Sequence, residues 1–308
     1  MSINQERLTA FNKLLKTEIV GNPARITAES SSSDKNSSDG VSSNTGTSSS
    51  NSETSPPNTN EYWDSIDSTN NRLAQLAREG APEGTTVISR QQTAGRGRLG
   101  REWVSEFDSG LYLSTLLRPE RSIAELPVIT LCLGVAAKRA ILALSGIEPG
   151  LKWVNDLIYD TKKLAGILVE IPIGATQSSQ SNALVIGIGI NLKTPSSSLP
   201  QEIADKAIYL DQICDANVEA ANLAAELCFQ IEEVYKKMQN NELNLLLDEW
   251  RAGSVTLGQT IQTANGDIEG LAEDIDQNGA LLVKTKDGTR LLHAGEITIR
   301  GKDGSYSY

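Results

Sequence analysis

The stretch Thr93-Ala94-Gly95-Arg96-Gly97-Arg98-Leu99-Gly100-Arg101-Glu102-Trp103 carries the strongest signal in the sequence. Three arginines and three glycines fall within seven of its residues, in a chain whose formal net charge is −11. Glycine lets backbone N–H groups approach a ligand closely, and the planar arginine side chain matches phosphate or carboxylate. We therefore predict a loop that holds a small anion. An exposed basic loop with surface ion pairs is the alternative that this stretch leaves open.

The segments on both sides of this loop alternate between strand and helix patterns, which predicts an α+β domain. We expect strands at 62–66, 85–90, 111–117, 151–154, 157–159, 164–171 and 183–192. We expect helices at 69–78, 126–144, 217–239 and 244–250, the first capped by Ser68 and ended by Gly80. The helix at 126–144 is apolar almost all round, which is typical of a buried helix.

The two ends of the chain differ from this middle part. After Gly253, the turn dipeptides Asn265-Gly266, Asn278-Gly279 and Asp287-Gly288 separate short β-rich runs, so 254–301 are predicted to form a small β-barrel. Near the N-terminus, apolar spacing predicts a helix at 5–19. Residues 28–59 hold 13 serines among 32 residues, which predicts a disordered tether.

Composition excludes several classes of function. The acidic charge argues against broad binding to nucleic acid or to anionic membranes. No run of 18 apolar residues occurs, because Lys138 and Arg139 interrupt the longest one, so no membrane span is expected. Three widely spaced cysteines indicate reduced thiols and a cytoplasmic location. The single histidine, His293, lacks both metal-site spacing and a nucleophile elbow.

Two polar segments near the loop are candidate ligand contacts. Ser68-Thr69-Asn70 lies at a predicted strand-to-helix junction, where it either binds a polar ligand or simply caps the helix. Gln92 leads into the loop, which matches neither a Walker A motif nor a dinucleotide-binding fingerprint. Trp103 could stack on a fused ring, although a tryptophan at such a junction is more often part of a core.

Two further segments carry candidate chemistry. Lys152-Trp153-Val154-Asn155-Asp156 and Lys162-Lys163-Leu164-Ala165-Gly166 place lysines beside apolar strands, where an anionic ligand would balance their charge. Asp156 could orient a lysine or hold Mg²⁺, whereas the alternative is a charged turn with its lysines in solvent. In Gly187-Ile188-Gly189-Ile190-Asn191, the glycines let a ligand lie against the strand and Asn191 could contact adenine, or the segment is a bulge followed by a turn.

Together, in this order, these motifs resemble those of the bacterial biotin–protein ligases, from Ser68 to about Arg300. The matching residues also include Glu170 and the run Gly295-Glu296-Ile297-x-Ile299-Arg300, whereas Val154 replaces the familiar proline. The resemblance implies a mixed central sheet flanked by helices, similar to class II aminoacyl-tRNA synthetases, with an SH3-like C-terminal barrel. It divides the chain into 1–60 (helix and tether), 61–252 (catalytic), 253–302 (barrel) and 303–308 (tail).

The resemblance implies that ATP activates biotin as biotinyl-5′-AMP, which a lysine of a biotin carboxyl carrier protein of acetyl-CoA carboxylase then attacks. It implies catalytic roles for Lys163, Arg98, Lys152 and Asp156, with Asp156 also a candidate Mg²⁺ ligand. The implied biotin contacts are Ser68, Thr69, Asn70, Gln92, Gly95, Arg96, Gly97, Arg98, Lys163, Gly166 and Gly189. The implied ATP contacts are Arg96, Arg98, Trp103, Lys152, Asn155, Asn191, Glu296 and Arg300.

The implied substrates are biotin and ATP with Mg²⁺, and no tightly bound prosthetic group is expected. Some bacterial members carry an N-terminal DNA-binding domain, but residues 1–60 contain one short helix and no basic recognition helix. We therefore expect a ligase without nucleic-acid or membrane partners, as a monomer or weak homodimer. A lipoate–protein ligase is the nearest alternative enzyme, and an adenylate-sensing DNA-binding regulator is the alternative outside enzymes.

Overall fold

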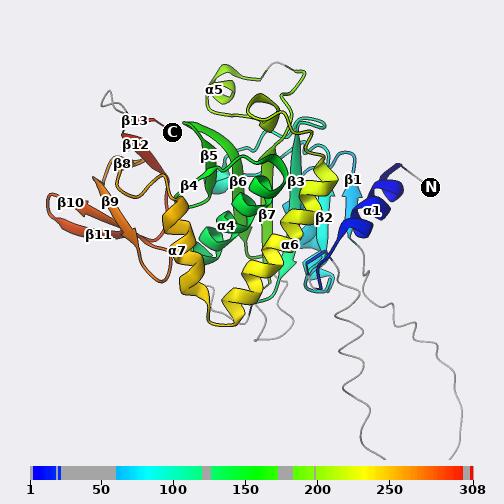
Figure 1. The fold of residues 1–308 in the computed structure, drawn as a ribbon, viewed down its shortest axis with the longest axis horizontal. Coiled ribbons are helices and arrows are strands. Elements are labelled where there is room, and N and C mark those ends of the chain that lie inside the picture. Colours follow the sequence, from blue (N-terminus) through cyan, green and yellow to red (C-terminus); the bar gives the residue numbers. More distant parts are fainter. Residues whose placement is uncertain are drawn as a thin grey trace, which may run out of the picture.

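A seven-stranded mixed sheet forms the centre of the larger domain (Figure 1). The computed structural model describes residues 3–18, 20–21, 60–119, 126–172, 183–197, 199–300 and 306–307. The strand order is β1-β2-β3-β7-β6-β5-β4; β1 and β2 run parallel, and the other neighbours are antiparallel. The strands are β1 (Glu61–Trp63), β2 (Thr86–Ser89), β3 (Gly110–Leu117), β4 (Gly150–Lys152), β5 (Asp156–Tyr159), β6 (Lys162–Glu170) and β7 (Leu184–Asn191).

Helices cover both faces of this sheet. α3 (Thr69–Arg78) packs on one face, against β2, β3 and β7. α4 (Leu126–Ser145), α6 (Ala220–Gln239) and α7 (Leu243–Gly253) cover the other face. The alternation along β3 explains the division, because Leu111 and Leu113 join the core under α4 and α6 whereas Ser114 contacts α3. A small second core on the α3 side includes Leu73 and Leu116.

α4 is apolar on nearly all sides because it packs against the sheet, α6 and α7. By length and composition alone, Pro127–Ser145 could cross a membrane, with a mean hydropathy of 1.8. Its packing gives the other explanation, since 67% of that window is buried within the fold. The predicted buried helix is thus confirmed.

The C-terminal segment forms a separate antiparallel β domain beside β4 (Figure 1). Its sheet has the order β11-β10-β9-β8-β12-β13. The strands are β8 (Thr260–Thr263), β9 (Glu269–Ile275), β10 (Leu281–Thr285), β11 (Gly288–Leu292), β12 (Ile297–Arg300) and β13 (Tyr306–Ser307). Gly266, Gly279 and Gly288 have positive φ angles, one at each of the three predicted turns.

The predicted helix near the N-terminus is shorter than expected. α1 (Ile3–Leu14) ends before residues 15–18, which continue without helical structure. The predicted tether at 28–59 lies outside the described residues. Three short helices were not predicted: η1 (Arg98–Gly100), α5 (Gln201–Ala204) and η3 (Leu210–Gln212). Each spans only about one turn, which is too short for a periodic pattern of apolar residues to predict it.

Candidate functional site

The arginine- and glycine-rich loop turns back on itself between β2 and β3. The Gly97 N–H donates to the Arg101 carbonyl at 2.7 Å, and the Trp103 N–H donates to the Gly95 carbonyl at 3.0 Å. A Cβ on Gly95 would lie 2.2 Å from the Trp103 oxygen, so this close approach requires glycine. The tip is the η1 turn, where Leu99 is exposed and has a φ of 56°.

A cavity lies between this loop and the α3 face of the sheet. Twelve of the residues predicted to bind biotin or ATP line it: Ser68, Thr69, Asn70, Gln92, Arg96, Gly97, Arg98, Trp103, Asn155, Lys163, Gly166 and Gly189. It is also lined by Gly187, whose segment was a candidate ligand surface, and by residues to which the sequence gave no binding role: Tyr112, Leu113, Ile167, Leu168 and Ile188. Four predicted segments that are far apart in sequence therefore meet in one place.

One end of the cavity is a fixed polar network around Gln92. Its Oε1 accepts hydrogen bonds from the Thr69 N–H at 2.8 Å and the Thr69 hydroxyl at 3.1 Å, while its Nε2 donates to Ser105 Oγ at 2.9 Å. Ser68 occupies the N-cap position of α3 but makes no side-chain capping bond, so the predicted capping role of Ser68 is wrong. Gln92 instead accepts a hydrogen bond from the first N–H group of the helix, that of Thr69.

Glycines on β6 and β7 form the floor of the cavity. Gly166 and Gly189 are direct partners in the β6–β7 ladder. Cβ atoms at these positions would lie 2.9 Å and 2.5 Å from the Trp103 ring, and one on Gly187 would lie 2.2 Å from Asn70 Oδ1. The side chains of this chain therefore already occupy the space above the glycines. The Trp103 Nε1 is buried there and has no hydrogen-bond acceptor among the described residues.

The other end of the cavity carries cations. Lys163 Nζ forms an ion pair with Asp156 Oδ1 at 2.7 Å and lies 5.2 Å from the centre of the Trp103 ring. Arg98 donates to Asn155 Oδ1 at 3.1 Å and to the Gly295 carbonyl at 3.2 Å, and its burial lowers the pKa of its guanidinium. Cationic groups gathered at this end of the cavity suit an anionic ligand, which would compete with Asp156 for Lys163.

Lys152 lies just behind this end and is only 4% exposed. The pKa of its ammonium group is lowered to about 8, mainly by burial and in part by the positive charge of Lys163, while the negative charge of Asp156 acts in the opposite direction. A nearby anion would raise this pKa and so favour the charged form. The lysine is therefore matched to a ligand that brings negative charge.

The remaining predicted residues lie outside the cavity lining. Asn191 Nδ2 donates to the carbonyls of Lys163 and Ile208, so this side chain fixes the backbone that carries Lys163. Glu296 forms an ion pair with Arg101 of the loop, and Arg300 is exposed at the end of β12. Lys152, Asp156 and Gly95 also lie outside the lining, although Asp156 pairs with Lys163 and Gly95 lies against the Trp103 main chain.

Glu170 is a residue to which the sequence analysis gave no role. Its Oε1 pairs with Arg96 of the loop at 2.7 Å, and its Oε2 accepts a hydrogen bond from Asn70 Nδ2 at 2.9 Å. The available signal was a lone carboxylate directly after the apolar run of β6. Glu170 thus connects the loop to the polar end of the cavity.

Residues 62–191 match the profile of the Biotin/lipoate A/B protein ligase family, and residues 256–300 match the Biotin protein ligase C terminal domain. The bifunctional ligase/repressor BirA of Bacillus subtilis is 31% identical over 240 residues, which are 77% of this chain and 73% of the relative. That of Bacillus spizizenii is 32% identical over the same shares. This chain belongs to the biotin protein ligase family.

Other members of the family agree in sequence and in fold. The biotin–[acetyl-CoA-carboxylase] ligase of Mycobacterium tuberculosis is 30% identical over 242 residues, covering 75% of this chain and 85% of that one. The structure of the biotin protein ligase from Aquifex aeolicus in complex with biotin and ATP aligns with a TM-score of 0.68 and 29% identity. That alignment covers 78% of this ligase and 97% of the other.

Proposed function

We propose that this protein is the biotin–[acetyl-CoA-carboxylase] ligase that attaches biotin, through biotinyl-5′-AMP, to one lysine of a biotin carboxyl carrier protein. The observation that carries the proposal is the cavity, with hydrogen-bonding groups at one end and cations at the other. Biotin has a polar ring system at one end and a carboxylate at the other, so it matches this arrangement. Relatives named for this activity and for biotin and ATP support it.

In the first step, a carboxylate oxygen of biotin attacks the α-phosphorus of ATP. A new oxygen–phosphorus bond forms, and the bond to the leaving pyrophosphate breaks. Thr69 and Gln92 would hold the biotin ring, while Lys163 and Arg98 would offset the charge that gathers around the reacting phosphate. The biotin-contacting set also includes Ser68, Asn70, Gly95, Arg96, Gly97, Gly166 and Gly189.

In the second step, the neutral amine of the acceptor lysine attacks the carbonyl carbon of the mixed anhydride. An amide bond forms, AMP leaves with the electrons of the carbon–oxygen bond, and the amine gives up a proton. The anhydride must be kept from water until the carrier arrives. The loop carrying Arg96 and Arg98 covers the cavity and would provide this protection.

ATP would lie toward Lys152, Asn155 and Trp103, whose buried Nε1–H offers a free donor among the described residues. Asn191 would act through the backbone of Lys163, and Glu296 and Arg300 would act from the C-terminal domain. Mg²⁺ commonly binds one or two carboxylates together with substrate phosphates. Asp156 can supply one carboxylate, and the described residues hold no cluster of three or more metal-binding side chains.

The decisive experiment is ATP-dependent transfer of labelled biotin to a purified carrier domain, with lipoate in a parallel arm. We expect transfer of biotin alone, and transfer of lipoate alone would overturn the proposal. Lys163→Ala should lower the rate of adenylate formation about 100-fold or more, because a donor aimed at developing charge is lost. Lys162→Ala is the matched control, because Lys162 directly precedes Lys163 in β6 and lies outside the cavity lining.

The finer aspects of the proposal concern partners and location. The packing of α1 on α6 and β1 supports a ligase that does not bind DNA, which a promoter-binding assay at several salt concentrations would test. Cys132, Cys214 and Cys228 are free thiols, which supports a cytoplasmic enzyme without membrane association. We propose a monomer or weak homodimer, to be measured by analytical ultracentrifugation.

A further inference from the structure

The N-terminal segment 3–21 precedes the region that matches the family profile, yet it is packed into the ligase domain. α1 lies against α6 and β1, at the opposite end of the sheet from the C-terminal domain (Figure 1). The side chains of Phe11 and Val20 are fully buried in the main core. Burial of a phenylalanine and a valine contributes roughly 3–6 kcal/mol in total, so this segment is held firmly.

A buried carboxylate on α6 anchors the end of this segment. Glu232 is 2% exposed, and its oxygens accept hydrogen bonds from the main-chain N–H groups of Glu18 at 2.9 and 3.0 Å and of Val20 at 3.0 Å. Lys236 forms an ion pair with the same carboxylate at 2.9 Å. The Gly21 N–H donates to the Gly84 carbonyl at 2.7 Å, next to β2.

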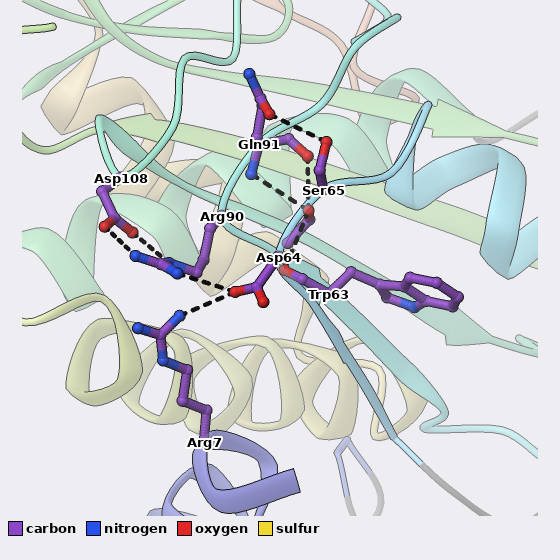
Figure 2. Close-up of polar contacts among 8 residues, drawn as sticks. Arg7, Trp63, Asp64, Ser65, Arg90, Gln91 and Asp108 are labelled. Carbon is purple, nitrogen blue, oxygen red and sulfur yellow. Dashed lines mark hydrogen bonds and ion pairs between the residues drawn. The ribbon is translucent and has the colours of Figure 1, made fainter. Parts of the chain in front are cut away.

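From this anchored position, α1 forms an ion pair with the segment that follows β1. Arg7 pairs with Asp64 at 3.2 Å, and Asp64 also pairs with Arg90 at 2.9 Å. Arg90 pairs in addition with Asp108, and these hydrogen bonds raise the pKa of Arg90 and lower that of Asp108. Figure 2 shows the four charged groups, here called the Arg90 cluster (Arg7, Asp64, Arg90 and Asp108), in a continuous chain.

Two members of the Arg90 cluster, Asp64 and Arg90, lie on two paired segments that lead into the cavity. The Arg90 N–H donates to the Trp63 carbonyl at 3.0 Å, the Ile66 N–H to the Gln91 carbonyl at 3.2 Å, and the Ser65 hydroxyl to Gln91 Oε1 at 3.0 Å. The pairing continues as the Thr93 N–H donates to the Ile66 carbonyl at 2.8 Å. Ser68 and Gln92 follow directly, so the position of these segments sets the polar end of the cavity.

We propose that segment 3–21 is a positioning element of the ligase: anchored by Glu232, it acts through Arg7 and the Arg90 cluster to fix the segments that present Ser68, Thr69 and Gln92 to biotin. This inference rests on the proposed biotin pocket. Arg7 touches no substrate and is a positioning residue. Its removal should widen the range of positions open to segments 63–67 and 90–94, which weakens biotin binding before it weakens ATP binding.

The test compares Arg7→Ala with Lys13→Ala in the full chain, since both remove one positive charge from α1 and Lys13 is exposed. Exposed ion pairs have modest energies, so R7A should raise the KM for biotin about two- to fivefold. The KM for ATP and the kcat of adenylate formation should stay unchanged, and so should all three constants in K13A. High salt should raise the wild-type KM for biotin toward that of R7A, because screening weakens exposed pairs.

A double-mutant cycle with Asp64→Asn separates coupling from a general loss of stability. On the D64N background, R7A should have no further effect on the KM for biotin. If R7A lowers the melting temperature while the KM for biotin equals that of K13A, segment 3–21 only stabilises the fold and the inference is overturned. Gln92→Ala tests the pocket itself: an unchanged KM for biotin there would remove the pocket assignment, whatever R7A does.

Discussion

At the residue scale, two side chains fix the shape of the cavity through their contacts with other residues of the chain. Gln92 satisfies the first N–H of α3 and the hydroxyl of Ser105 with opposite ends of one amide. Glu170 holds Arg96 and Asn70 with its two oxygens. Both arrangements order the polar end of the cavity before a ligand binds. Less conformational entropy is then lost on binding.

Lys152 gives the residue scale its clearest prediction. Its pKa of about 8 belongs to the free enzyme, so above that pH an increasing share of the lysine is neutral and cannot attract the triphosphate. The kcat/KM for ATP should therefore fall about tenfold per pH unit above this pKa. Steady-state adenylate formation from pH 6.5 to 10 measures the slope.

The matched variant is Lys152→Arg, whose guanidinium stays charged across this range. It should show a flat profile between pH 8 and 10, even where its absolute rate is lower. Equal slopes in the wild type and in K152R would show that another group titrates.

At the scale of elements, the β6–β7 pair depends on its glycines to accept Trp103. A Cβ on residue 189 would lie 2.5 Å from the indole ring, so Gly189→Ala must push the ring away from the floor of the cavity. We expect a loss of about 1–3 kcal/mol in unfolding free energy and at least a tenfold rise in the KM for ATP. Chemical denaturation and adenylate kinetics measure the two effects.

The companion variant Gly189→Ala/Trp103→Leu removes the ring that causes the clash. It should recover most of the lost stability but not the affinity for ATP. If G189A alone leaves the free energy of unfolding and the KM for ATP at wild-type values, the position of Trp103 does not depend on a glycine at residue 189.

The helices and strands were largely predictable from the sequence, because each has a pattern of apolar residues with the spacing of a helix or a strand. Leu126 to Leu144 and Ala183 to Leu192 were predicted within one or two residues, since apolar runs of those lengths have few alternatives. The site residues were found through a resemblance of motifs. The partners of Glu170 and Asn191 were not predictable, because they come from segments that meet only in the folded chain.

At the scale of the whole molecule, the cavity is held from both ends of the sheet. At the β1 edge, Arg7 of segment 3–21 pairs with Asp64, in a segment that leads to the cavity, and the C-terminal domain reaches the cavity from the β4 edge. The C-terminal contacts are the ion pair between Arg101 and Glu296 and the hydrogen bond from Arg98 to the Gly295 carbonyl. Both contacts are made by the loop that covers the cavity, so residues of both domains hold this loop over the cavity.

Breaking the ion pair between the loop and the C-terminal domain should therefore release the intermediate faster. Glu296→Gln should raise the release rate of labelled biotinyl-AMP about two- to fivefold, since the Arg101 side chain is largely exposed and such pairs contribute up to about 1 kcal/mol. The exchanged pair Arg101→Glu/Glu296→Arg should restore part of the retention, whereas Asp287→Asn, in an exposed turn of the same domain, should have no effect. Release that is equally slow in E296Q and in the wild type would show that the loop closes without this ion pair, through its contacts with Glu170, Asn155 and the Gly295 carbonyl.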